Sequence, residues 1–330
     1  MPGVGLRGHW RPPPRPKTRD CRVRKGKEQS MASLRLNIAD LVLQVETTQP
    51  SVCLEPGLAY NDFIANGGSP SVYLHFHYGV VPDVRLGARI SSGEGLWGLY
   101  EAGGKYVLQI EPGLRAGSGT PPAKGWITIL EKDFSSGDMY LWGDDPITDS
   151  RPACIYPLAH PWSELLVVNL LSRGRGLEVH GCGVIAHGNG LLFCGVSGAG
   201  KSTLAELWKK RNVTILSDDR LILRQRSGIF HVYGTPWHGD ARVSSNLSAP
   251  ASRIYFLRKY PTNYLKRLPQ QDAATQILTR CFPTFHLAEG MEFTLEFIDE
   301  LTRRVPCYEL GFVPEDSAIE MVLNHDGPEQ

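Results

Sequence analysis

The chain has 330 residues, of which 42% are hydrophobic and 21% are charged, and its formal net charge at pH 7 is +1. This length allows a sizeable core and predicts two domains, while the balanced charge excludes a strongly charged partner for the molecule as a whole. No apolar run is long enough to cross a bilayer, and seven cysteines without C-x-x-C pairs or a secretory signal predict reduced thiols, a cytoplasmic location and no membrane partner.

The first 30 residues are rich in arginine, lysine and proline. A segment of this composition cannot bury enough apolar surface to fold, so residues 1–30 are predicted to form a disordered basic extension. Met31 stands where the first alternating pattern begins and is an alternative start of translation, in which case residues 1–30 are not made. Nucleic-acid binding would rest on this removable segment alone, so no nucleic-acid partner is expected.

Residues 31–160 have the pattern of a β-rich region. Apolar residues alternate with polar ones over short segments such as 34–38 and 41–45, and glycine-rich turns separate the segments. The segments 96–100 and 106–110 are predicted to form a hairpin across the Gly-Gly pair between them. We therefore expect a mostly antiparallel sheet, and we find no catalytic constellation in it.

Residues 161–330 mix helical and strand patterns, as an α/β nucleotide-binding domain requires. A helical stretch over 162–171 follows a proline, and a Gly-Asn-Gly turn at 188–190 leads into an apolar strand over 191–194. The segment 317–323 has the pattern of a final amphipathic helix. The predicted fold class is α/β, with a β-rich N-terminal region followed by a phosphate-loop domain.

The segment 195–202 reads Gly-Val-Ser-Gly-Ala-Gly-Lys-Ser and matches the phosphate-loop motif G-x-x-x-x-G-K-[ST] at every position. It lies between an apolar strand and a helix-forming segment. Glycines allow backbone N–H groups to point at phosphate oxygens, and the start of the helix favours negative charge. The lysine reaches the β- and γ-phosphates and the serine hydroxyl binds Mg²⁺. The residues predicted to hold the nucleotide are Gly195, Ser197, Gly198, Ala199, Gly200, Lys201, Ser202 and Thr203.

Two adjacent carboxylates, Asp218 and Asp219, follow an apolar strand over 213–217. Beside bound phosphates, one carboxylate can hold Mg²⁺ while the other takes a proton from an attacking hydroxyl. The alternative interpretation is a surface turn, because Asp-Asp pairs are common in turns.

Three further residues are candidates for the same site. His180 lies one hairpin before the phosphate loop, although a lone histidine is more often structural. The loop over 233–242 contributes Asp240, which would support the metal, and Arg242, which would neutralise charge on the γ-phosphate. Each of these residues has a structural alternative in a tight connection. The basic residues Arg258, Lys259, Lys266 and Arg267 either contact phosphate or cover a solvated face, and the second interpretation is preferred.

These segments together resemble the C-terminal kinase domain of bacterial HPr kinase/phosphorylase, with the phosphoenolpyruvate carboxykinase group as a more distant relative. The resemblance covers residues 177–245 and rests on His180-Gly181, the phosphate loop and the segment 217–220. It implies ATP-dependent phosphorylation of a protein serine, with Asp218 as base and Asp219 as metal ligand, and the two roles can be exchanged. Because that family forms hexamers, the resemblance also implies a homo-oligomer.

The sequence departs from the HPr kinase pattern in two respects. Thr203-Leu204 follows the loop where the family has glutamate, and we find no segment like the one with which that family docks its carrier protein and performs phosphorolysis. The Gly-Thr-Pro-Trp segment at 234–237 and the closing segment 305–315 look instead like divergent HPr-kinase-related proteins. The resemblance therefore supports the type of reaction in this chain better than it supports the identity of the phosphate acceptor.

The resulting prediction is a cytoplasmic kinase that uses ATP and Mg²⁺ to phosphorylate a serine-type hydroxyl on a protein or peptide. The predicted catalytic residues are Asp218, Lys201, His180 and Arg242, and the predicted metal ligands are Ser202, Asp219 and Asp240. Two alternatives remain open, namely a nucleotide-gated binding or regulatory module with little or no turnover, and a small-molecule kinase.

Overall fold

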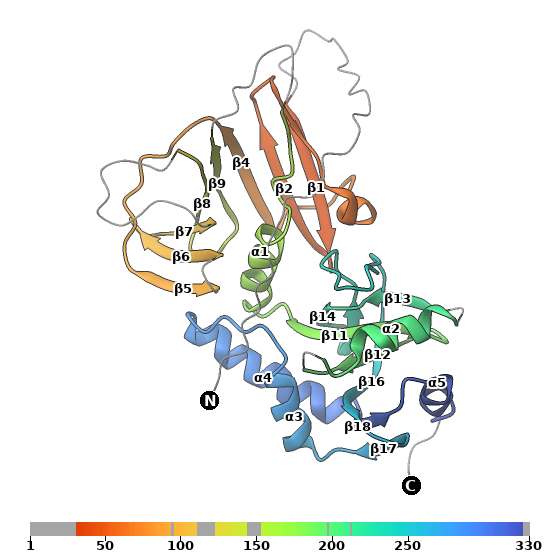
Figure 1. Ribbon diagram of the computed structural model, residues 1–330. Helices are drawn as coiled ribbons and strands as arrows, with labels where there is room; N and C mark the ends of the chain where they lie inside the picture. Colours follow the sequence, from red (N-terminus) through yellow and green to blue (C-terminus); the bar gives the residue numbers. More distant parts are fainter. Residues whose placement is uncertain are drawn as a thin grey trace.

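The computed structural model describes residues 31–93, 96–110, 123–143, 153–196, 198–211 and 213–325. In these ranges the chain forms two eight-stranded sheets, a small two-stranded sheet and five α-helices (Figure 1). The fold is thus mixed α/β with a β-rich N-terminal region, as the sequence predicts. The basic segment 1–30 lies outside the described residues. None of the described helices has the length and apolarity that crossing a membrane requires.

The N-terminal sheet has the strand order β1-β2-β4-β9-β8-β7-β6-β5. Its strands are β1 (Ala32–Ile38), β2 (Leu41–Thr47), β4 (Val72–Tyr78), β5 (Arg89–Gly93), β6 (Trp97–Ala102), β7 (Lys105–Ile110), β8 (Gly125–Leu130) and β9 (Ser136–Trp142). The pairs β2–β4 and β4–β9 are parallel and the other pairs are antiparallel. The prediction of a mostly antiparallel sheet is confirmed.

Local sequence explains the two tight hairpins of this sheet. Gly103 and Gly104 connect β6 to β7 with φ angles of 56° and 79°, a left-handed conformation that glycine adopts without a steric penalty. Ala39 and Asp40 connect β1 to β2 in the same conformation. Along β1 the alternating apolar side chains are buried, as the period of two requires. The predicted hairpin across the Gly-Gly pair is confirmed.

The C-terminal sheet has the order β12-β11-β14-β15-β16-β18-β17, with β13 paired to β11. Its strands are β11 (Leu177–Ala186), β12 (Asn189–Cys194), β13 (Thr214–Ser217), β14 (Arg220–Arg226), β15 (Ile229–Tyr233), β16 (Ser248–Lys259), β17 (Tyr264–Arg267) and β18 (Cys307–Phe312). The long strand β16 pairs first with β15 and then runs parallel to β12 and β18. Because β12 also pairs with β11, the strands β12, β11, β14, β15 and β16 form a closed ring of pairings.

Helices cover both faces of the parallel part of this sheet. The helices that do so are α2 (Lys201–Lys209), α3 (Gln270–Leu278), α4 (Ala288–Arg304) and α5 (Asp316–Leu323). The other helices of the described chain are the 3-10 helix η1 (Leu58–Phe63) and α1 (Trp162–Leu171). Phe193 and Tyr255 pack in one core with α2 and α5, whereas their neighbours Leu192 and Phe256 pack in another with α3 and α4. Successive residues of a strand point to opposite faces, so one strand contributes to both cores.

Helix α1 lies between the two large sheets (Figure 1). Its buried residues, including Leu166 and Leu170, belong to the core of the N-terminal sheet. The same core contains Ile222, Tyr233 and Trp237 from the C-terminal half. The helix therefore connects the β-rich region to the strands that carry the candidate site.

Candidate functional site

Several segments that are distant in sequence end at one edge of the C-terminal sheet. Strand β12 ends at Cys194, its parallel neighbour β16 ends at Lys259, and β18 is parallel to β16. Strand β11 is antiparallel to β12 and places Gly181 opposite Cys194, and β13 is antiparallel to β11. The carboxyl ends of parallel strands meet at the same edge, which is where open α/β sheets bind their ligands. The strand directions thus bring the phosphate loop, the Asp-Asp pair and Lys259 together.

The phosphate loop requires glycine at two described positions. Gly198 and Gly200 have φ angles of 76° and 105°, which side chains of L-residues rarely adopt. A Cβ atom on Gly200 would also lie 2.7 Å from Cζ of Phe312 at the end of β18. Helix α2 begins directly after this glycine, so the N–H groups of its first turn are free to bind an anion.

Lys201 is held by its own loop. Its Nζ donates hydrogen bonds to the carbonyl oxygens of Gly195 and Val196 at 2.7 Å and 3.2 Å, and only 7% of the residue is exposed. Burial lowers the pKa of Lys201, whereas the charge of Asp219 acts in the opposite direction. The lysine is therefore placed at the loop and oriented before any ligand arrives.

A cavity of about 430 Å³ lies at this edge, within the size range of small-molecule sites. The predicted residues that line it are His180, Gly198, Gly200, Lys201, Ser202, Thr203, Asp218, Asp219 and Asp240. Gly239, for which no role was predicted, and Lys259, for which a solvated face was preferred to phosphate contact, also line the cavity. The register of the sheet thus places most of the predicted site residues around one cavity.

Of the other predicted site residues, the described ones (Gly195, Ala199 and Arg242) do not line the cavity. Gly195 must be glycine for the loop to close, because a Cβ atom there would lie 2.8 Å from Cβ of buried Ala199. Arg242 is exposed and follows a turn in which its N–H donates to the carbonyl oxygen of Gly239 at 3.2 Å. The structure does not bring Arg242 into the cavity, and its catalytic role stays a prediction. Ser197 lies outside the described residues.

Asp218 is a buried carboxylate that anchors the loop after β15. Its Oδ1 accepts a hydrogen bond from the N–H of Gly239 at 2.9 Å, and its Oδ2 accepts one from the N–H of Ala241 at 2.7 Å. Only 2% of the residue is exposed. Each oxygen retains a second lone pair, because a carboxylate oxygen can accept two hydrogen bonds.

Asp219 has a different environment. Its Oδ1 lies 3.0 Å from Nδ1 of His180, and its Oδ2 accepts a hydrogen bond from Nη1 of Arg220 at 2.7 Å. Burial acts to raise the pKa of Asp219, but the hydrogen bond with His180 and the charge of Arg220 outweigh it and hold that pKa below its usual range. Asp219 is consequently ionised at neutral pH and only weakly basic.

Arg220 connects the site to an acidic pair, partly buried Glu164 and fully buried Glu178, that the sequence did not single out. Its Nε lies 3.0 Å from Oε1 of Glu164 on α1 and 3.5 Å from Oε1 of Glu178 on β11. Its guanidinium carbon lies 4.4 Å from the ring centroid of Phe282, a cation–π distance. The sequence signal that could have identified this pair is Glu178 itself, because an acidic residue between the apolar Leu177 and Val179 is unusual in a buried strand.

The two glutamates of this pair have opposite ionisation. Burial raises the pKa of Glu178 well above its usual range, and the negative charge of Glu164 raises it further. Burial acts on Glu164 in the same direction, but His160 and Arg220 outweigh it and hold the pKa of Glu164 at about 2. Glu178 therefore carries a proton beside an ionised Glu164.

Replacing Glu178 by glutamine should stabilise the protein increasingly as the pH rises. The raised pKa means that folded Glu178 keeps a proton that the unfolded chain loses above about 4.5, so the wild type loses stability from that pH up to the folded pKa. Glutamine stays neutral and escapes this loss, which amounts to about 1.4 kcal/mol per pH unit. Urea unfolding of Glu178→Gln and wild type at several pH values measures the difference, with exposed Glu292→Gln as control. A difference that does not vary with pH would contradict the assignment.

The residues around the cavity fit a nucleoside phosphate with a divalent cation. The glycine backbone and the start of α2 suit an anion, and Lys201 and Lys259 add positive charge. Ser202, Asp219 and Asp240 supply the oxygen donors that Mg²⁺ prefers.

Comparisons with known proteins place the chain in a family. The model of the family described as SynChlorMet cassette protein ScmC matches residues 147–313. No curated protein matches the chain. Among solved structures, the chain is similar to the HPr(Ser) kinase/phosphatase from Coxiella burnetii, with 16% identity over 45% of this chain and 95% of that chain and a TM-score of 0.29. The family match spans half of the chain and includes the phosphate loop and the Asp-Asp pair, and the chain belongs to the ScmC family.

Proposed function

We propose that the protein is an ATP- and Mg²⁺-dependent kinase of HPr-kinase-like type that phosphorylates a serine-type hydroxyl on a protein or peptide. The observation that carries the proposal is that the phosphate loop and the Asp-Asp pair line the same cavity. A phosphate loop alone indicates nucleotide binding, whereas carboxylates beside it supply the groups that phosphoryl transfer to a hydroxyl requires.

The loop and the lysines would bind and orient the phosphates. Backbone N–H groups at the start of α2 and the ammonium group of Lys201 would hold the β- and γ-phosphates, and Lys259 approaches from the parallel strand β16. Bound Mg²⁺ would neutralise negative charge on the phosphates, and Ser202 and Asp219 would be its protein ligands, with Asp240 beside them. Catalysis would then consist mainly of positioning and charge neutralisation.

The environments of the two aspartates support a division of roles. Asp219 is paired with His180 and Arg220 and has a lowered pKa, which suits a metal ligand and makes it a poor base. Asp218 accepts only backbone hydrogen bonds and lies free of ion pairs among the described residues. We therefore assign proton removal from the acceptor hydroxyl to Asp218. His180 would orient Asp219.

The test is phosphate transfer by the full chain with γ-labelled ATP and Mg²⁺, offered serine peptides and, separately, small hydroxyl compounds. We expect Mg²⁺-dependent phosphoserine on a peptide. Labelled phosphate on the small compounds alone would show that the acceptor is a small molecule and not a peptide. ATP binding without transfer to any acceptor would favour a nucleotide-gated regulatory module, and a chain that binds no nucleotide would refute the proposal entirely.

Replacing Lys259 by methionine should raise the KM for ATP about threefold to tenfold, because an exposed charge near phosphate contributes about 1 kcal/mol. The effect should shrink at high salt, where exposed charges are screened. Arg258→Met is the matched control, since Arg258 is adjacent and exposed but does not line the cavity. Steady-state kinetics at low and high ionic strength measure both. Equal effects of the two substitutions would remove Lys259 from the site.

A further inference from the structure

Two short parallel strands bring together cysteines that are distant in the sequence. Strand β3 (Val52–Leu54) pairs with β10 (Ala153–Ile155) so that Cys53 lies directly opposite Cys154. The pairing continues past β3, because the N–H of Glu55 donates to the carbonyl oxygen of Ile155 at 2.8 Å. Residues i and i+2 of a strand point to the same face. Cys53 and Glu55 therefore share a face with Cys154.

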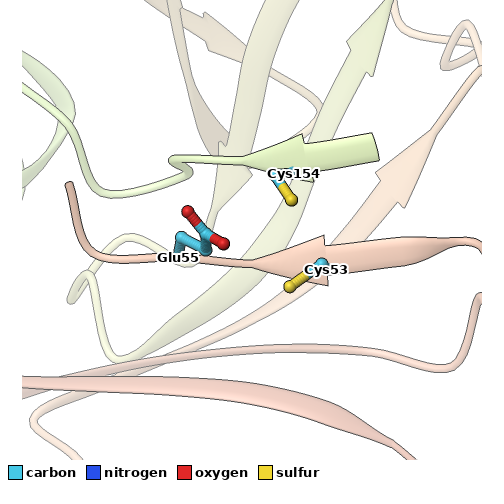
Figure 2. A group of neighbouring side chains, drawn as sticks. All are labelled: Cys53, Glu55 and Cys154. Atoms are coloured by element: carbon cyan, nitrogen blue, oxygen red, sulfur yellow. The ribbon is translucent and has the colours of Figure 1, made fainter. Parts of the chain in front are cut away.

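The side chains on this face form a compact set of metal-ligand atoms (Figure 2). The sulfur atoms of Cys53 and Cys154 and a carboxylate oxygen of Glu55 all lie within 4.8 Å of one another. Ligand atoms around a tetrahedral zinc ion, with bonds of about 2.0–2.3 Å, are about 3.5 Å apart. Small side-chain rotations would bring the three atoms to that spacing without movement of the paired strands.

A tyrosine lies beside this set of ligand atoms. Tyr156 follows β10 and lies close enough to Glu55, Cys53 and Cys154 to interact with their charges. A polar group beside a metal ligand commonly fixes the direction of that ligand.

We propose that Cys53, Glu55 and Cys154 bind a zinc ion, with water in the fourth position. Thiolates select zinc, copper(I) or iron–sulfur clusters, whereas a carboxylate ligand disfavours copper(I) and two cysteines are too few to hold a four-cysteine cluster. Each thiol releases its proton to solvent when it binds, so binding liberates two protons and changes no oxidation state.

The proposed zinc would link the segment that follows β2 to the segment that precedes α1. Strands β4 to β9 all lie between Cys53 and Cys154 in the sequence, so the ion would close a loop around most of the N-terminal sheet. Its ligands are assembled only in the folded protein, and zinc should therefore raise the thermal midpoint. This site is separate from the phosphate-loop cavity, and it holds or fails independently of the proposed kinase activity.

The experiment is a cobalt titration of the full, phosphine-reduced chain in excess Mg²⁺, which occupies oxygen-donor sites. Bound cobalt should show thiolate charge-transfer absorption that saturates at one equivalent and is abolished by added zinc. Cys53→Ser and Cys154→Ser should lose this absorption, and Glu55→Gln should weaken cobalt binding about tenfold or more. Cys281→Ser is the matched control, because Cys281 is also partly buried but lies outside the cluster, and it should keep the wild-type spectrum.

Thermal unfolding separates a lost site from a damaged fold. Metal-free wild type and Cys53→Ser should unfold at the same temperature, and zinc should raise only the wild-type midpoint. A cobalt spectrum that is unchanged in Cys53→Ser would overturn the proposal. A reduced chain that binds no cobalt would also overturn the proposal. If that chain then forms a Cys53–Cys154 disulfide in air, the pair is a redox element instead.

Discussion

An Asp218→Asn variant is expected to bind ATP as the wild type does and to transfer its phosphate about a hundredfold to ten-thousandfold more slowly. The carboxylate is held at the cavity by the N–H groups of Gly239 and Ala241, at 2.9 Å and 2.7 Å. Asparagine keeps the size of the side chain and one acceptor oxygen, but it cannot take a proton from a hydroxyl. Single-turnover transfer of labelled phosphate, with ATP affinity measured by calorimetry, tests the expectation.

The control for this variant addresses the loop that Asp218 anchors. Asparagine replaces one acceptor by an NH₂ group that faces a backbone donor, so the variant is expected to lose some stability. Loss of transfer with unchanged ATP affinity would show that the loop is still in place. Transfer within about threefold of wild type would contradict the assignment of the base, and the same assay on Asp219→Asn would then test the exchanged roles.

Replacing Lys201 by methionine is expected to weaken ATP binding about a hundredfold or more. The substitution keeps the buried stem and removes the only charged donor within the described part of the loop. Two charge-assisted hydrogen bonds to phosphate are worth about 3 kcal/mol or more together, and 1.4 kcal/mol corresponds to a factor of ten in affinity. Calorimetric titration with Mg²⁺-ATP measures the loss.

Lys210→Met is the matched control for Lys201→Met. Lys210 is exposed and caps the opposite end of the same helix, α2, so its replacement changes the charge of the protein equally without touching the loop. We expect ATP affinity to be unchanged in this control. Equal losses in both variants would mean that overall charge, and not the loop, governs binding, which would contradict the phosphate-loop assignment.

The parts of the fold that were predictable from sequence are those that short segments determine. The hairpin at Gly103-Gly104, helix α1 and the strand–loop–helix unit around Lys201 each depend on turn chemistry and periodicity within a few residues. Helix α4 carried a similar signal, since Phe293, Phe297 and Leu301 recur at helical spacing and pack against the sheet, yet it was not identified.

The missing parts of the site depend on strand order, which local patterns do not encode. Lys259 reaches the phosphate loop only because β16 runs parallel beside β12, and the sequence interpretation preferred a solvated face for it. Glu178 contacts Arg220 because β11 pairs with β14. Arg242 was expected at the cavity because it shares a glycine-containing loop with Asp240, but after the turn at Gly239 it does not line the cavity.

Helix α1 has a consequence for the cooperativity of the molecule. Leu166 and Leu170 belong to the same core as the N-terminal sheet and Trp237, whose Nε1 donates a hydrogen bond to Ser163 of α1 at 2.9 Å. Glu164 on the same helix forms an ion pair with Arg220. Removal of residues 31–160 would expose this apolar face and loosen the helix that positions Arg220, and through it Asp219. The β-rich half is thus part of the scaffold of the candidate site, and the isolated C-terminal half would not reproduce the site of the whole protein.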